Sequence, residues 1–496
     1  MKVFLVCMLL ACTLFANGQY SYEYIFDDTE NQLVFHGIET EYGDYFLVGQ
    51  IGNSNSTHDA YIIKVGHGGD TLSQRITNDE NNAYLSYILQ LENNTYLLIG
   101  QSGPINSNYY NNMWFVKMNS DLEILDERYY QLPSSYYFSI GLSYAILKEN
   151  GNVIISGSAK YTPHSDLCTV VINSDLDTLN TKFYPYQFSQ SVDDWVEIPG
   201  TSDYLMLGGK IGLYGTSAQA IRFDSSLNIV SIQNLPIDLT VHGSIGHWKG
   251  SDEYLHSGVL RDTTGTGTDD DFSIAVQIVD TSATIIKHRY FGKPDTTDYS
   301  AWRNSMAYFN DTTIYVGGFT IIFGATYDPL PTFLELYMID NDLNLLGYSQ
   351  YGGDANYQMW GVIPSSDGGC LMYGTRYGVE NGPYERDVYI KKVLRKEINI
   401  ITSIEEYAGG EFQTSAYPNP VGGILNIPLK SSWNSNNIHL RIVDSEGRTV
   451  YDKQIIGKGN LITVNVTSLN PGPYIYSVYD NKQLVVSGKF IKHNLH

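Results

Sequence analysis

The chain has 496 residues, enough for about three domains of ordinary size, although propellers run longer as single domains. Its 30 Lys and Arg residues stand against 53 Asp and Glu residues, and the net charge of −23 disfavours phosphate backbones and anionic lipid headgroups. We therefore expect no nucleic-acid partner. With 41 Tyr and only 17% charged residues, the composition favours β-structure and excludes intrinsic disorder.

The first residues have the pattern of a secretory signal peptide, residues 1–18. An apolar run from Val3 to Leu10 follows a lysine, and small residues lead to Gly18, after which we expect cleavage. The alternative is a lipoprotein signal that acylates Cys12. No later stretch reaches the ~18 apolar residues of a membrane helix, so we expect an exported chain without an integral membrane segment.

One block recurs along the chain: a polar turn, an apolar or Tyr-rich strand, and then a glycine. The block ends at Gly49, Gly100, Gly157, Gly208, Gly258, Gly317 and Gly374. Successive glycines lie 50 to 59 residues apart, which is the length of four short strands and typical of a propeller repeat. Seven such blocks predict a seven-bladed β-propeller over residues 19–396.

Each repeat also contains two hairpin turns rich in Asn, Asp and Gly. Residues 149–152 join a first to a second strand, and residues 173–176 join a third to a fourth strand. Both kinds of turn must share one face of the disc. The variable loops between second and third strands, together with the crossovers between blades, therefore share the opposite face, which we call the long-loop face.

Ring closure needs a partner for the last open sheet edge. We expect residues 20–26 to supply the fourth strand of the seventh blade. The alternative is that residues 398–401 complete that blade. The Asp-Gly-Gly-x-Leu form at residues 367–371 and the aromatic-x-x-Lys pattern of the third strands resemble the repeats of secreted bacterial propellers akin to Kelch and quinoprotein types.

After a linker at residues 397–414, residues 415–496 read as alternating apolar strands separated by Gly, Asn and Pro turns, which predicts a small immunoglobulin-like β-sandwich. The segment contains Tyr-Pro-Asn-Pro, an Asp-x-x-Gly turn, Leu-x-x-Gly-x-Tyr and a final Lys-Phe strand. The motif residues are Tyr417, Pro418, Asn419, Pro420, Asp444, Gly447, Leu469, Gly472, Tyr474, Lys489, Phe490 and Lys492.

In this order the motifs resemble the type A C-terminal sorting domain of the type IX secretion system. Prolines on both sides of Gly472 and a tail at residues 493–496 depart from the family pattern. The resemblance implies contact with the type IX machinery, passage across the outer membrane of a Gram-negative bacterium and, often, attachment to surface polysaccharide. The alternative is an ordinary adhesive immunoglobulin-like domain.

The sequence lacks the spacings of familiar catalytic and metal motifs, such as His-Glu-x-x-His, Gly-x-Ser-x-Gly and Cys-x-x-Cys. We expect no metal and no cofactor. Residues 269–271 form an acidic run that could gather Ca²⁺, but a solvated loop is the favoured interpretation. Asp175 and Asp177 resemble half of a calcium loop, yet they fall in a repeated turn. Cys168 and Cys370, alone after the signal, exclude a disulfide framework.

An aromatic residue recurs near the start of the first strands, at Phe35, Tyr87, Tyr144, Trp195, Trp248, Trp302 and Trp360. Packing between blades or a collar at the channel mouth explains this recurrence. Tyrosines in the variable loops favour ligand contact on the long-loop face. The candidate residues are Tyr109, Tyr110, Tyr214, Tyr327, Tyr377 and Tyr384.

The sequence thus favours a secreted or surface-displayed binding module for a glycan or protein ligand. The alternative is an extracellular glycan hydrolase or lyase with paired carboxylates at the channel mouth.

Overall fold

In the computed structural model the chain divides into two compact units, Met1–Thr402 and Ser403–His496, and each is described by itself. The structure describes residues 20–27, 29–53, 57–76, 81–104, 110–132, 137–161, 164–185, 189–212, 215–235, 239–240, 246–261, 272–282, 284–292, 297–321, 332–378, 386–400, 416–428, 438–444, 448–455, 461–480 and 483–493. The expected signal peptide with Gly18, most of the linker, and residues 269–271 lie outside these ranges.

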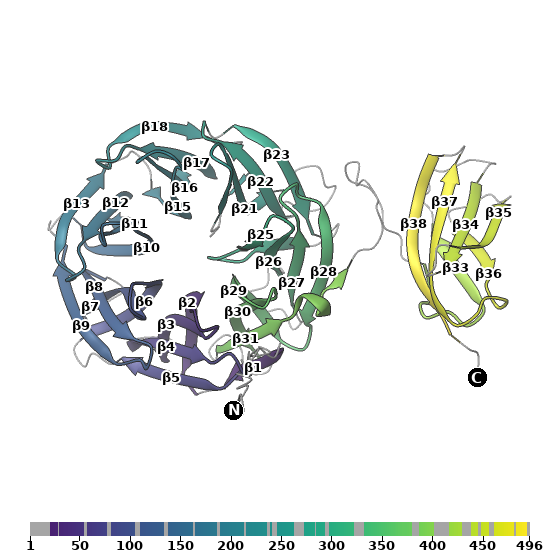
Figure 1. Cartoon of the computed structure of the whole chain (residues 1–496), viewed down its shortest axis with the longest axis horizontal. Coiled ribbons are helices and arrows are strands. Elements are labelled where there is room, and N and C mark those ends of the chain that lie inside the picture. Colours follow the sequence, from purple (N-terminus) through teal and green to yellow (C-terminus); the bar gives the residue numbers. More distant parts are fainter. Residues whose placement is uncertain are drawn as a thin grey trace, which may run out of the picture. The chain divides into compact units, whose positions relative to one another are not determined.

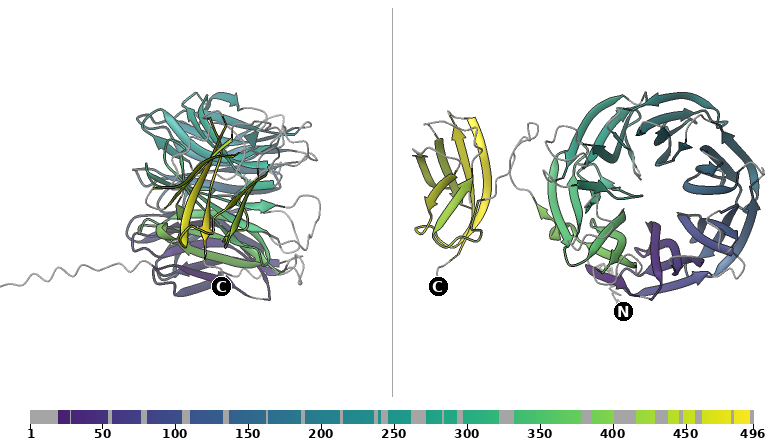
Figure 2. Two further views of the ribbon diagram at one scale, coloured as in Figure 1. Left: turned by 90° about the vertical axis from the view of Figure 1, so that its right-hand side faces the viewer. Right: turned by 180° about the vertical axis from the view of Figure 1, so that it is seen from behind.

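The first unit is a ring of antiparallel sheets around a common axis, seen face-on in Figure 1 and from behind in Figure 2. Within the described residues there are seven such sheets, so the seven predicted blades are confirmed. Blade 1 comprises β2 (Asn31–Glu39), β3 (Tyr45–Asn53), β4 (Thr57–Val65) and β5 (Thr71–Ile76). Blade 2 comprises β6 (Asn81–Gln90), β7 (Thr95–Pro104), β8 (Asn112–Asn119) and β9 (Ile124–Gln131). Blade 3 comprises β10 (Ser139–Leu147), β11 (Val153–Lys160), β12 (Ser165–Ile172) and β13 (Thr178–Tyr184).

In blades 4 to 6 the inner strand is interrupted. Blade 4 comprises β14 (Ser189–Gln190), β15 (Asp194–Glu197), β16 (Tyr204–Gly212), β17 (Gly215–Phe223) and β18 (Ile229–Asn234). Blade 5 comprises β19 (Leu239–Thr240), β20 (His247–Lys249), β21 (Glu253–Arg261), β22 (Phe272–Asp280) and β23 (Ile285–Phe291). Blade 6 comprises β24 (Thr297–Ser300), β25 (Met306–Asn310), β26 (Thr313–Ile321), β27 (Phe333–Ile339) and β28 (Leu345–Gly352).

Blade 7 closes the ring. It comprises β29 (Asn356–Pro364), β30 (Cys370–Tyr377), β31 (Asp387–Val393) and, from the other end of the unit, β1 (Tyr22–Phe26). β1 runs antiparallel to β31, with Tyr22 opposite Lys392 and Phe26 opposite Val388. The predicted clasp is therefore confirmed. The alternative is wrong, because β32 (Asn399–Ile400), which follows the 3-10 helix η2 (Arg395–Glu397), pairs with β28 of blade 6.

The hairpin turns follow from side-chain hydrogen bonding. Between β12 and β13, the Asn173 side-chain oxygen accepts hydrogen bonds from the backbone N–H groups of Asp175 at 3.0 Å and Asp177 at 2.8 Å. Leu176 in the same turn is buried and has a φ of 64°, which a leucine rarely adopts. The acidic residues of this segment thus belong to the turn.

The repeat glycine has a steric cause. The inner strand β2 bulges between Val34 and His36, and this brings its backbone against Gly49 of β3. A Cβ atom on Gly49 would lie 1.8 Å from the carbonyl oxygen of Leu33, and one on Gly157 would lie 2.2 Å from that of Gly141. Only glycine fits where two backbones approach so closely.

The second unit is a two-layer β-sandwich. One sheet has the order β35-β34-β37-β38, and the other pairs β33 with β36. The strands are β33 (Ile424–Pro428), β34 (Ile438–Asp444), β35 (Thr449–Ile455), β36 (Leu461–Asn465), β37 (Gly472–Asp480) and β38 (Gln483–Lys492). Their inward residues, including Leu440, Ile442, Val464 and Phe490, form one buried core. The expected immunoglobulin-like sandwich is borne out.

Candidate functional site

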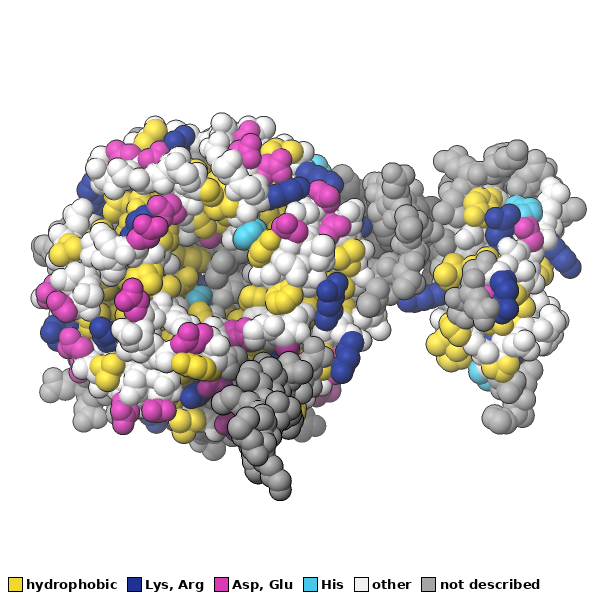
Figure 3. Space-filling model, viewed as in Figure 1, with side chains coloured by type: hydrophobic (Ala, Val, Ile, Leu, Met, Phe, Trp, Pro, Cys, Tyr) yellow, Lys and Arg dark blue, Asp and Glu magenta, His cyan; other side chains and the backbone are white. Residues whose placement is uncertain are grey.

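Bulges decide which side chains face the centre of the ring. In four blades the inner strand carries one extra residue, and these residues are Phe35, Ser86, Ser143 and Trp360. A bulge re-aims a side chain out of the regular ladder. The inner strands that carry these residues surround the axis of the ring (Figure 1), and we call the hollow at this axis the channel (Figure 3).

Blade 6 departs from this pattern by looping out three residues, Trp302, Arg303 and Asn304. The flanking residues Ala301 and Ser305 both hydrogen-bond to the backbone of Gly317, at 3.0 and 2.8 Å. The looped residues instead pair with blade 7: the N–H of Arg303 donates to the carbonyl oxygen of Trp360 at 3.0 Å, and the Asn304 carbonyl accepts from Val362 at 2.8 Å. The Arg303 backbone is therefore fixed between two blades.

Arg303 lies in the loop of blade 6 that is bonded to β29, and its positive charge bears on ionisable groups of other blades. Burial raises the pKa of Asp193 in blade 4 to about 7, whereas a hydrogen bond from Ser191 and the charge of Arg303 lower it. Burial lowers the pKa of His36 in blade 1 to about 3, and Arg303 lowers it further. Arg303 also offsets the burial-driven rise in the pKa of Tyr84, Tyr144 and Tyr373. The charge of Arg303 thus bears on groups in five other blades.

Aromatic rings run from the channel to the long-loop face. The rings of Phe35 and Trp360 lie 5.0 Å apart, Phe35 and Tyr84 lie 5.7 Å apart, and Tyr84 and Tyr110 lie 4.7 Å apart. The Tyr110 hydroxyl is 2.6 Å from Nε2 of His58. We call Phe35, Tyr84, Tyr110 and Trp360 the aromatic cluster. Figure 3 shows the opposite face of the ring, which carries the hairpin turns and is hollowed at its centre, with hydrophobic side chains around the hollow.

Of the six predicted ligand-binding tyrosines, the structure describes Tyr110 and Tyr377. Tyr110 is half-buried and lies two residues before β8, and its backbone N–H donates to Ser139 of blade 3 at 3.1 Å. Tyr377 ends β30 opposite Asn356 and is half-buried. The other four lie outside the described residues: Tyr109, Tyr214, Tyr327 and Tyr384. The structure brings Tyr110 together with Tyr84, which the sequence interpretation missed.

The seven recurring aromatic residues do not share one position in the blades. Those that pack into cores between blades are Tyr87, Tyr144, Trp195, Trp248 and Trp302. Phe35 and Trp360 are bulged residues in mutual contact beside the channel. Trp360 also packs against the core between blades 1 and 7, so packing between blades explains six of the seven.

Two pairs of carboxyl groups bear on the enzyme hypothesis: Asp193 with Asp194 in blade 4, and Asp298 with Glu335 in blade 6. Asp194, which is 2% exposed, accepts hydrogen bonds from the Tyr254 hydroxyl, from Gly246 N–H at 3.0 Å and from Trp195 N–H at 2.8 Å, so its role is structural. The second pair, in blade 6, is fully buried and closed to a substrate. Asp193 in blade 4 is half-buried, whereas the other three carboxyl groups of these pairs are buried.

Within the described ranges, no group of three His, Cys, Asp or Glu side chains is arranged to hold a metal ion. Cys168 and Cys370 are buried free thiols. No helix in the described part of the chain has the length and apolar character of a membrane span.

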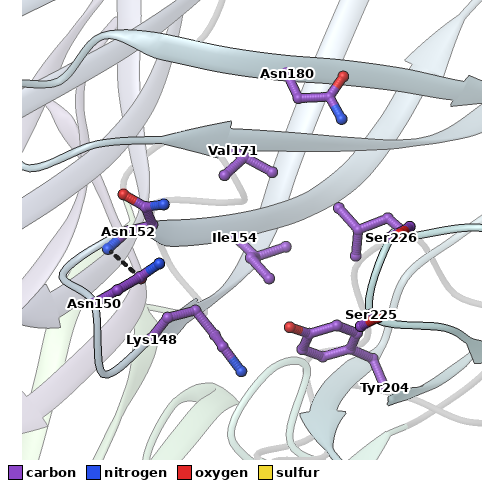
Figure 4. Close-up of a pocket in the computed structure, with 10 residues that line it drawn as sticks. Lys148, Asn150, Asn152, Ile154, Val171, Asn180, Tyr204, Ser225 and Ser226 are labelled. Atoms are coloured by element: carbon purple, nitrogen blue, oxygen red, sulfur yellow. Dashed lines mark hydrogen bonds between the residues drawn. The ribbon is translucent and has the colours of Figure 1, made fainter. Parts of the chain in front are cut away.

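A pocket of about 320 Å³ lies between blades 3 and 4, on the face of the hairpin turns (Figure 4). Asn150 and Asn152 enter from a turn of blade 3, and Ser225 enters from a turn of blade 4. Lys148 lines the pocket but is already paired with Glu197 at 2.6 Å. This pocket lies on the face opposite to the predicted ligand-binding loops.

In the second unit, the first and last sorting motifs form one structure. The Asn419 side-chain oxygen accepts a hydrogen bond from the backbone N–H of Ile491 at 2.9 Å, and the backbone of Val421 bonds to Ile491 and His493 at 2.8 and 3.0 Å. Tyr417 pairs with Asn426 through two backbone bonds of 2.8 Å.

The remaining motif residues have structural roles. Asp444 accepts hydrogen bonds from the backbone and the guanidinium of Arg448, at 2.9 and 2.8 Å, and so shapes the turn whose Gly447 lies outside the described residues. Tyr474 stacks on Phe490 with ring centres 5.4 Å apart. Leu469 packs against the core, Lys492 is buried and Lys489 is exposed.

The strand pairing defines an all-β protein in which a seven-bladed propeller is followed by a small sandwich. The sandwich is identified more closely by its sequence: residues 415–493 match the family described as secretion system C-terminal sorting domain. This domain directs the protein across the outer membrane by type IX secretion, to the cell surface or the extracellular space. No curated protein matches the chain.

Similar solved structures are remote. The β-propeller domain of the trilobed protease from Pyrococcus furiosus, which has an open velcro topology, is 7% identical over 78% of this chain and 99% of that chain, with a TM-score of 0.39. The polysaccharide lyase Uly1 is 10% identical over 76% and 100%, with a TM-score of 0.42. The endosialidase of phage phi92 is 8% identical over 95% and 87%, with a TM-score of 0.41. These likenesses carry no argument about activity.

Proposed function

We propose that the protein is an exported β-propeller binding module for a glycan or protein ligand, delivered by its C-terminal sorting domain and displayed on surface polysaccharide or released. The aromatic cluster carries the proposal. Its rings connect the channel with the long-loop face, where loop length varies between blades. Aromatic faces stack on the apolar faces of sugar rings and lose little side-chain entropy on binding.

A glycan array with the full chain tests this proposal, followed by titration of any glycan it retains. Tyr110→Ala should weaken binding about tenfold, because it removes one stacking surface. Tyr42→Ala is the matched control: Tyr42 is 64% exposed in a hairpin turn on the opposite face. Loss of affinity in the Tyr42 variant alone would place the ligand on the wrong face for this proposal.

Asp193 favours a second candidate, an extracellular glycan hydrolase or lyase. A carboxyl group with a pKa of about 7 beside a channel can act as a general acid or base near neutral pH. Incubation of the retained glycan with the full chain should then yield shorter products, and Asp193→Asn should abolish them while binding persists. Intact glycan after prolonged incubation would exclude this candidate.

A further inference from the structure

Arg303 is a cation without an opposite charge in contact. Among the described residues it makes no salt bridge, whereas Arg75, Arg222 and Arg376 each bond to a carboxylate. Asp193, the acid on which Arg303 acts, is instead hydrogen-bonded to the Ser191 hydroxyl at 3.1 Å. A half-buried guanidinium loses hydration without compensation unless an anion reaches it.

The position of Arg303 is built by its neighbours. The three-residue loop that carries it replaces the single bulge of other blades, and its backbone is fixed along β29. Trp302 precedes it in the chain, and the carbonyl of Trp360 accepts its N–H. The site thus combines an arginine on a fixed backbone with the inner end of the aromatic cluster.

We propose that the channel binds an acidic glycan, whose sugar carboxylate pairs with Arg303 while a neighbouring ring face stacks on Phe35 or Trp360. The planar guanidinium donates two parallel hydrogen bonds to a carboxylate, and Arg makes this contact better than Lys. The inference rests on the proposed binding function and specifies its ligand. The net charge of −23 opposes non-specific attraction of polyanions, so recognition depends on this single cation.

Isothermal titration of the full chain with an oligogalacturonate tests the inference. Its fully methyl-esterified counterpart has the same backbone without charge, and a carrageenan oligosaccharide supplies sulfate without carboxylate. We expect the free acid to bind and the ester to bind at least tenfold more weakly. Arg303→Gln should weaken binding of the free acid about tenfold to a hundredfold, and Arg303→Lys should weaken it less.

Arg128→Gln is the matched control, because it removes the same charge from an exposed site on the outer strand β9. Unchanged affinity in this variant, with a normal melting temperature for both glutamine variants, assigns the loss to Arg303. Equal binding of acid and ester, preference for the sulfated sugar, or no binding of any of the three would overturn the inference. In each case the glycan array remains an independent test of the binding module.

Discussion

Glu335 and Asp298 form a buried, hydrogen-bonded carboxyl pair in blade 6, and both side chains are 0% exposed. The hydroxyls of Tyr348 and Tyr337 donate to Glu335 at 2.8 and 3.1 Å. Burial raises the pKa of Glu335 and the charge of Asp298 raises it further, whereas the two hydroxyls lower it. The folded pair therefore retains a proton at a pH where an exposed carboxyl group has lost it.

This proton makes stability depend on pH. In the unfolded chain Glu335 loses its proton near pH ~4.3, the ordinary pKa of Glu. Between that pH and the raised pKa of the folded pair, the folded state binds one proton more, so each pH unit lowers the free energy of unfolding by about 1.4 kcal/mol. The contribution of this proton to the free energy of unfolding is fully present below about pH 4. It is lost as the pH rises, by about 3 kcal/mol over two pH units.

Glu335→Gln removes the titration while keeping the shape of the side chain. Denaturant unfolding of the full chain at about pH 5 and about pH 7 should show a drop in the free energy of unfolding that is about 3 kcal/mol larger in the wild type than in this variant. Glu149→Gln, in an exposed turn, is the control and should keep the wild-type pH dependence. If Glu335→Gln keeps it as well, the pair does not hold a shared proton and the reasoning is wrong.

Three further outcomes follow from the fold. Replacing both Tyr22 and Phe26 by Ala should lower the stability of the propeller by about 2–4 kcal/mol, because these half-buried rings attach the clasp to the core of blades 1 and 7. An unchanged melting temperature would argue against closure by β1. Gly49→Ala should destabilise by about 1–3 kcal/mol in thermal unfolding, whereas Gly378→Ala, with open space around it, should be neutral; equal effects would reject the close-approach explanation. A reporter carrying a signal peptide and residues 415–496 should reach the surface or medium in cells with a working type IX apparatus, and equal export without that apparatus would contradict the assignment.

The blade number and the clasp could be predicted because their signals are local. Repeat glycines mark places where a bulged backbone presses on its neighbour, and Asx turns such as that at Asn173 determine their own hairpins. β1 was recognisable as a strand left over after seven repeats. The position of β32 was not predictable, since a two-residue strand carries too little pattern to choose between the edges of blades 6 and 7.

The channel residues could not be predicted from the repeat, because they depart from it. Arg303 stands where blades 1, 2, 3 and 7 carry a single bulged residue, and the inserted backbone that carries it is bonded to blade 7. The signal in the sequence is the misfit of residues 301–305 to the blade pattern. The contact between Tyr84 and Tyr110 could not be predicted for a related reason. It depends on the register in which β6 pairs with β7, and the sequence pattern of a single strand does not show that register.

The hydrogen bond between Asn419 and Ile491 joins residues 72 positions apart, at the two ends of the sorting domain. Asn419 is synthesised before β38, the strand that supplies its hydrogen-bond donor. A chain cut short before Ile491 leaves Asn419 without this donor and the backbone of Val421 without its two partners. The first motif of the sorting domain therefore has its full set of hydrogen bonds only when β38 is present.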